Sequence, residues 1–190
     1  MMIKRNVLSC FLLLLTMMLS AQVKMRDVFK QMPSTVVPYL NDNSKLDFID
    51  FIDSGMKAEV TNALNGKSVM QQLTDDYLRL SLNEASELTM RLLPVSEQVD
   101  STNQVVCMVR TYGTDIQESV IAFYSVNWRR LPLDDYLSLP KGMWVATLNE
   151  NEAELTLTSD NRLDAPANEE QKVFAEKTII LKWIGKFVNK

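Results

Sequence analysis

From about residue 68 onward, apolar residues of this 190-residue chain recur at every second position, and this spacing restricts the chain to extended strands. Apolar and polar side chains alternate from Leu78 to Leu82, and again from Leu88 to Leu92. Successive side chains of a strand point to opposite faces, so each segment presents one apolar face. Residues 83–86 between them are typical of a turn, and the pattern therefore predicts an antiparallel pair.

Further strands of the same kind are predicted in the second half of the chain. They cover residues 105–112, 119–125, 143–148 and 153–158, with turns at 113–115 and 149–151. The segment 178–188 fits either a helical stripe or a closing hairpin. We favour the hairpin, because β-branched residues run from Thr178 to Ile180 and Gly185 separates two apolar stretches.

Helical spacing is confined to the region before these strands. A first short helix is predicted to end before Pro33, since apolar residues lie at i, i+3, i+4 and i+7: Met25, Val28, Phe29 and Met32.

A second helix is predicted through residues 46–53, with Asn43 or Ser44 as its N-cap and Gly55 just past its end. Helices followed by strands indicate an α+β fold, with N-terminal helices packed on a mostly antiparallel, meander-like sheet. No linker interrupts residues 22–190, which we expect to form a single domain.

The first 21 residues have the order of a secretory signal peptide. Lys4 and Arg5 precede an apolar run of 13 residues from Val7 to Leu19, and cleavage is expected after Ala21. The alternative, an uncleaved anchor, needs about 20 apolar residues. The chain is therefore expected to be exported, periplasmic or secreted, without stable membrane insertion after cleavage.

The composition excludes several kinds of chemistry. The chain contains no histidine, so it cannot supply a Ser-His-Asp triad or an imidazole metal ligand. After the leader, only Cys107 remains, which excludes a cysteine zinc site and an internal disulfide and suits a buried apolar position. We therefore expect no cofactor and no metal.

The net charge of the chain argues against one class of partner. Loss of Lys4 and Arg5 with the leader leaves 18 basic and 24 acidic residues, a net charge of −6. No basic cluster is present to neutralise phosphates, and a nucleic-acid partner is therefore not expected.

One catalytic arrangement stays open, a pair of carboxylates of the glycosidase kind. The candidates are two acid pairs that each precede a tyrosine and a leucine: Asp75 with Asp76, and Asp134 with Asp135. Neighbouring acids on a strand point to opposite faces, so a working pair needs one acid from each segment. A carboxylate-dependent glycan hydrolase is therefore the alternative function.

We expect instead a non-enzymatic binding domain in the cell envelope, whose partner is a protein or envelope component. Trp128, Arg129 and Arg130 follow a predicted strand and set a tryptophan beside the only adjacent arginines, which favours a partner-binding loop. A carrier of an apolar ligand is a further alternative. It would have a cavity under the sheet lined by Met70, Met90 and Met108.

A distributed pattern also resembles a known family. The resemblance rests on Leu46-Asp47-Phe48-Ile49-Asp50-Phe51, Met56-Lys57-Ala58, Leu73-Thr74-Asp75-Asp76-Tyr77-Leu78, Leu92-Leu93-Pro94, Phe123-Tyr124, Trp128 and Leu131-Pro132-Leu133. These segments are similar to the DUF3256 family, uncharacterised exported proteins of Bacteroidales. The resemblance implies an exported setting in a Gram-negative cell and brings no catalytic residues. The ligand and the oligomeric state stay open.

Overall fold

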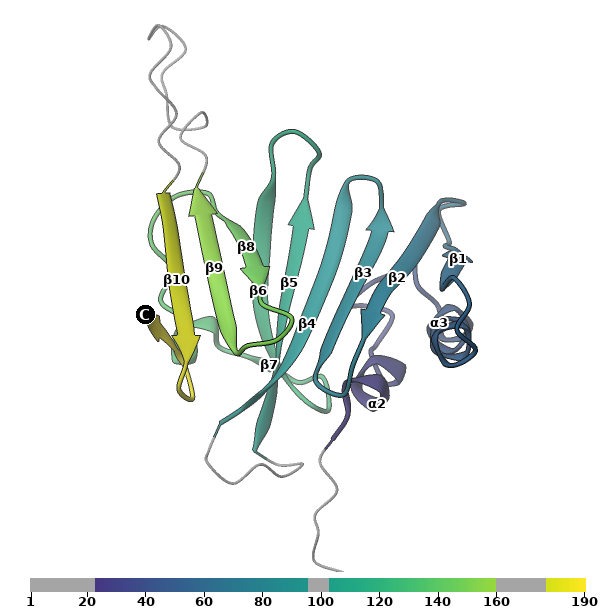
Figure 1. Cartoon of the computed structure of the whole chain (residues 1–190), viewed down its shortest axis with the longest axis horizontal. Helices are drawn as coiled ribbons and strands as arrows, with labels where there is room; N and C mark the ends of the chain where they lie inside the picture. Colours follow the sequence, from purple (N-terminus) through teal and green to yellow (C-terminus); the bar gives the residue numbers. More distant parts are fainter. Residues whose placement is uncertain (1–22, 96–102, 160–176) are drawn as a thin grey trace, which may run out of the picture.

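The computed structural model describes residues 23–95, 103–159 and 177–190, which form two short helices and two antiparallel sheets (Figure 1). The elements are α2 (Met25–Lys30), α3 (Asp42–Asp53), β1 (Glu59–Thr61), β2 (Lys67–Leu73), β3 (Tyr77–Asn83), β4 (Ser86–Pro94), β5 (Gln104–Tyr112), β6 (Glu118–Ser125), β7 (Arg130–Leu131), the 3-10 turn η2 (Leu133–Asp135), β8 (Val145–Leu148), β9 (Glu154–Ser159), β10 (Lys177–Trp183) and β11 (Phe187–Asn189). The predicted leader, residues 1–21, lies outside the described residues.

The strands are paired in chain order, as a meander. Sheet A has the order β1-β2-β3-β4-β5-β6-β7, and sheet B has the order β11-β10-β9-β8. Every neighbouring pair is antiparallel. The predicted antiparallel strands are therefore confirmed, but the division into two sheets was not predicted. The preferred hairpin near the C-terminus is also confirmed, since β10 pairs with β11 from Trp183 opposite Phe187.

Both predicted helices are present. The helix α2 ends at Lys30, before Pro33, as its spacing predicts. The helix α3 begins earlier than expected, because Asn41 is its N-cap: the side-chain oxygen of Asn41 accepts a hydrogen bond from the Ser44 amide at 2.8 Å. The prediction of Asn43 or Ser44 as the cap is wrong, since both residues lie inside the helix.

The helices cover one face of sheet A. Apolar residues of α2 and α3, including Phe29 and Phe48, form a buried core with alternate residues of β3 and β4, such as Leu80 and Met90. Lys45, buried in this core, donates from its ammonium to the Met32 carbonyl oxygen and so joins α3 to the chain that follows α2. This packing matches the predicted arrangement of helices on a sheet.

Sheet B covers part of the opposite face of sheet A. Its strand β8 packs on β4, β5 and β6. A second buried core forms there from both sheets, and its members include Cys107, Phe123, Leu157 and Trp183. The strands β4 and β5 are therefore buried on both faces through most of their length.

A buried arginine joins the two sheets at the edge of this second core. Arg91 of β4 donates one hydrogen bond to Asp76 Oδ2 at 2.7 Å and another to the carbonyl oxygen of Asn149 at 2.5 Å. Asn149 lies in the turn between β8 and β9, so this side chain ties that turn of sheet B to sheet A. None of the helices in the described part of the chain is long and apolar enough to cross a membrane.

The burial of Cys107 leads to a testable expectation. The Cys107 side chain has 0% exposure, and burial raises the pKa of its thiol. Labelling of this thiol in the chain from Gln22 onward is therefore expected to be far slower under native conditions than in denaturant. A Cys107→Ser variant carrying Thr178→Cys, at an exposed position of β10, is the matched control and should label rapidly in both conditions. Equal native rates for the two cysteines would contradict the core position of β5.

Candidate functional site

A groove of about 350 Å³ opens on the helix-bearing face of sheet A, beside the part that the helices cover. It is called here the aromatic–arginine groove, and its lining residues are Pro33, Thr35, Val36, Met108, Arg110, Tyr112, Val120, Ala122, Tyr124, Trp128 and Arg130. The lining therefore comes from the loop after α2, from β5 and β6, and from the start of β7 with the turn before it.

The register of β5 and β6 explains the floor of the groove. Met108 lies opposite Ala122, and Arg110 lies opposite Val120. Alternate residues of paired strands share one face, so this face changes from buried at Met108 to exposed at Val120, which is 51% accessible. An apolar strip of the sheet therefore reaches solvent where the helices no longer cover it.

Trp128 occupies a different position from the one expected. It lies in the turn after β6, as predicted, but its side chain is only 8% exposed. Its indole Nε1–H donates to the Val28 carbonyl oxygen at 2.8 Å, and its ring lies 5.3 Å from the ring of Tyr124. Trp128 is therefore not an exposed anchor: it packs against helix α2 and forms a wall of the groove.

The bond to Val28 also satisfies a helix end. The last four carbonyl groups of an α-helix have no partner within the helix, and Val28 belongs to that set in the short helix α2. Trp128 has a positive φ of 64°, in the left-handed region that non-glycine residues seldom adopt. The hydrogen bond and the ring contact hold the residue in this backbone conformation.

Two arginines bring positive charge to the groove. Arg110 donates to the Val36 carbonyl oxygen at 2.5 Å and to the Tyr112 hydroxyl at 3.2 Å, which fixes its guanidinium against the sheet. Its Nε is buried and has no hydrogen-bond partner among the described residues. Arg130 is exposed at the start of β7, and the lining contains no acidic residue. Arg129 is exposed beside it but does not line the groove.

Sequence reasoning identified only part of this site. It named Trp128 and Arg130 but missed Arg110, Tyr112 and Val120. Those three residues belong to strands that the alternation did predict. No sequence signal distinguishes their exposed face, because it depends on where the helices end in space.

None of the three pockets described in this article brings two of the four candidate catalytic aspartates together. Asp75 pairs with Lys24 at 3.2 Å, and Asp76 pairs with the buried Arg91. Asp134 and Asp135 both lie in η2, where Asp134 but not Asp135 lines a pocket of about 480 Å³ beside the β10–β11 hairpin. Neither Asp75 nor Asp76 lines that pocket, the aromatic–arginine groove or the third pocket described below.

The three methionines proposed for an apolar cavity lie in the core between the helices and sheet A. Met70 and Met90 are buried there, and of the three only Met108 lines the groove. In the part of the chain that the structure describes, no three side chains of the types that bind metals lie close enough together to hold an ion.

Comparisons with known proteins give a family and a fold. A family model described as "Protein of unknown function (DUF3256)" matches residues 16–165. A domain of an uncharacterized protein from Porphyromonas gingivalis W83 has a similar structure, with a TM-score of 0.71 and 20% sequence identity over 86% of this chain and 97% of that chain. At this identity the similarity shows the fold alone. No curated protein matches the chain.

The position of Trp128 predicts a structural role that can be measured. Trp128→Ala removes a buried ring and the hydrogen bond to Val28, and is expected to lower the free energy of unfolding by about 3–5 kcal/mol. Arg129→Ala, at the next and exposed position, should change it by less than about 0.5 kcal/mol. Urea titration followed by circular dichroism measures both variants. Similar values for the two would mean that the indole is not part of the core.

Proposed function

The chain belongs to the DUF3256 family of proteins of unknown function, and we therefore propose a function from the geometry of the chain itself. We propose that it is an exported domain, residues 22–190 after removal of a leader, that binds a protein partner non-covalently. The partner-binding site is the aromatic–arginine groove, and the partner contributes an acidic, extended segment with apolar side chains.

One observation carries this proposal: the groove places two arginines and exposed aromatic and apolar side chains together, with no carboxylate among them. Tyrosine, tryptophan and arginine are the residues that contribute most often to binding energy in protein interfaces. Tyr112 is 42% exposed, so its ring has apolar surface available to a partner. The buried Trp128 contributes as a rigid wall behind these contacts.

Charge favours an acidic segment as the partner. The chain from residue 22 onward has a net charge of −6, so a groove with two arginines and no acid is locally unlike the rest of the molecule. Guanidinium groups form paired hydrogen bonds with carboxylates. Arg110 is already held by Val36 and Tyr112, so its orientation costs a partner little ordering.

The role of the groove can be tested by substitutions at its exposed side chains. Combining Tyr112→Ala with Arg130→Ala should weaken partner binding by about thirtyfold, equivalent to about 2 kcal/mol, if both are interface anchors. Both side chains are exposed, so folding should change little. Affinity capture from the cell envelope identifies the partner, and titration with synthetic peptides of its acidic segments measures the affinity.

Arg129→Ala is the matched control, because it removes an adjacent exposed arginine that does not line the groove. Asp75→Asn with Asp134→Asn tests the alternative hydrolase function. The proposal is wrong if the folded groove variant captures its partner normally, and the hydrolase is favoured if the aspartate variant alone loses its biological effect.

Export generates a separate expectation, which rests on the order of basic, apolar and small residues before Gln22. In a Gram-negative host the released protein should begin at Gln22. Intact-mass measurement of the protein from the periplasmic fraction determines its first residue. A retained leader, or an added acyl mass, would contradict cleavage after Ala21.

A further inference from the structure

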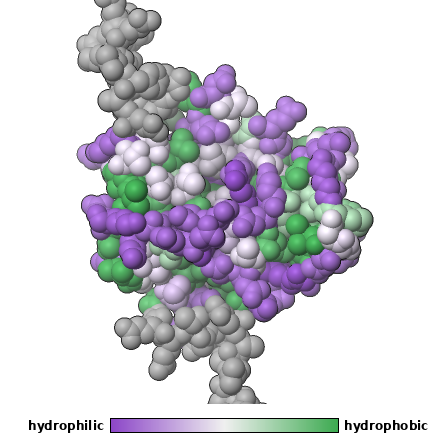
Figure 2. All heavy atoms as spheres, viewed as in Figure 1, coloured by the Kyte–Doolittle hydropathy of each residue, from purple (hydrophilic) through white to green (hydrophobic). Residues whose placement is uncertain are grey.

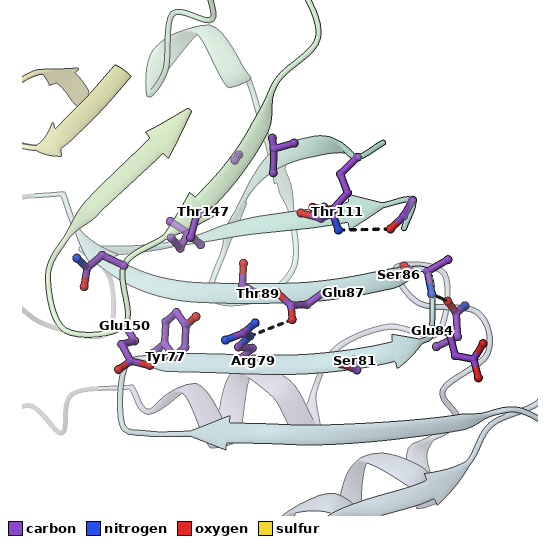
Figure 3. Close-up of a pocket in the computed structure, with 18 of the residues that line it drawn as sticks. Tyr77, Arg79, Ser81, Glu84, Ser86, Glu87, Thr89, Thr111, Thr147 and Glu150 are labelled. Carbon is purple, nitrogen blue, oxygen red and sulfur yellow. Dashed lines mark hydrogen bonds and ion pairs between the residues drawn. The ribbon is translucent and has the colours of Figure 1, made fainter. Parts of the chain in front are cut away.

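A cleft of about 660 Å³ opens on the other face of sheet A, the face that sheet B covers in part (Figure 3). It is called here the polar cleft. Tyr77, Arg79, Glu87 and Thr89 of β3 and β4 form its floor. The strand β8, with Thr147, and the turn that follows it form one wall. The turns β3–β4 and β5–β6 contribute to the other side.

The cleft exists because sheet B is narrower than sheet A. The strand β8 packs on β4, β5 and β6, and the residues of β3 that point to this face, such as Arg79 and Ser81, retain solvent access. In Figure 2 a band of hydrophilic side chains crosses the middle of this face, which Figure 1 shows to be formed by sheet B and the neighbouring strands of sheet A. The surface that sheet B leaves uncovered is therefore polar.

Hydrogen bonds within the protein hold the cleft in shape without a ligand. Arg91, buried on β4 beside Tyr77 at one end of the floor, donates to the Asn149 carbonyl oxygen and fixes the wall turn to sheet A. The Asn149 side chain accepts hydrogen bonds from the amides of Asn151 and Glu152 at 2.8 and 3.0 Å. On the floor, Arg79 Nε donates to Glu87 at 2.9 Å. The cleft is therefore preorganised.

The distribution of charge disfavours an anion. The only arginine of the lining, Arg79, is already paired with Glu87. The other two acids, Glu84 and Glu150, lie at opposite ends of the cleft (Figure 3). Separated exposed carboxylates attract a cation only weakly in water. The middle of the cleft is therefore polar and close to neutral.

Hydroxyl groups lie along the floor and the wall of the cleft. Thr89 of β4 shares the cleft face with Glu87, because side chains two positions apart on a strand point the same way. Ser86 also borders the cleft, but its side chain lies on the helix-bearing face with Leu88 and Met90. The hydroxyls of Thr89, Thr111 and Thr147 line the same cleft, which offers both donors and acceptors.

We propose that the polar cleft binds a neutral, polyhydroxylated ligand, namely a saccharide. Such a ligand supplies many hydroxyl groups that donate and accept, which matches a lining of hydroxyl and amide side chains. An apolar ligand would desolvate these groups without replacing their hydrogen bonds. The proposal concerns a different face from the aromatic–arginine groove and does not depend on the function assigned to that groove.

Calorimetric titration of the intact mature chain tests the proposal. The probes are neutral tetrasaccharides of glucose, mannose and N-acetylglucosamine, with a galacturonic acid tetramer and a tetralysine peptide as charged comparisons. At least one neutral tetrasaccharide is expected to bind. Thr89→Val, which removes a hydroxyl from the floor of the cleft, should weaken that binding about three- to tenfold, the effect of one lost hydrogen bond.

Two features make the test specific. Valine is close to threonine in shape and suits a strand, so Thr89→Val should leave the urea midpoint nearly unchanged. Thr147→Trp, at an exposed position in the cleft wall, should abolish binding by occupying the cleft. Thr178→Trp on β10 is its matched control, because Thr178 is exposed and lies outside the cleft.

The outcomes separate clearly. Binding of a neutral saccharide that Thr89→Val and Thr147→Trp weaken and Thr178→Trp does not would support the proposal. It is overturned if no neutral tetrasaccharide binds at millimolar concentration, if only a charged probe binds, or if the two cleft variants bind normally. An Arg130→Ala variant should bind the saccharide unchanged, which keeps this test independent of the groove.

Discussion

The strands β4 and β5 are buried on both faces, and the rest of the structure follows from the need to cover both. Side chains alternate across a strand, so a central sheet with apolar residues on each face requires two separate covers. Helices α2 and α3 cover one face and bury residues such as Leu80 and Met90. Sheet B covers the other and buries Cys107 and Phe123. The α+β architecture is therefore a sheet between two unlike layers.

Neither cover is as wide as sheet A, and the two candidate sites are the parts of each face left open. The helices leave one end of β5 and β6 uncovered, where Val120 reaches solvent in the aromatic–arginine groove. Sheet B ends short of β3, where Arg79 and Ser81 line the polar cleft. The two sites also differ in charge, since the groove has two arginines and no acid whereas the cleft has three glutamates and one arginine. Their ligands are therefore expected to differ in kind.

Two buried side chains fix the helices and sheet B in place on sheet A. Trp128 donates to the Val28 carbonyl oxygen of α2, and Arg91 donates to the Asn149 carbonyl oxygen of the β8–β9 turn. Each joins sheet A to a backbone group of a covering layer, and each is nearly inaccessible to solvent. A buried hydrogen bond is costly to break when one partner stays buried, so these bonds favour one position of each cover over others. Both sites border one of these anchors.

Local periodicity in the sequence by itself determined the secondary structure, because the spacing of apolar residues reports directly which side of an element is buried. It determined the two helices, the antiparallel strands and the C-terminal hairpin, and the distributed resemblance determined the family. Only the tertiary structure decided that the strands form two sheets, that Trp128 is buried and that Arg110 and Thr89 line open sites. These properties depend on contacts between distant segments, such as Trp128 with Val28, and no local pattern specifies where a covering layer ends.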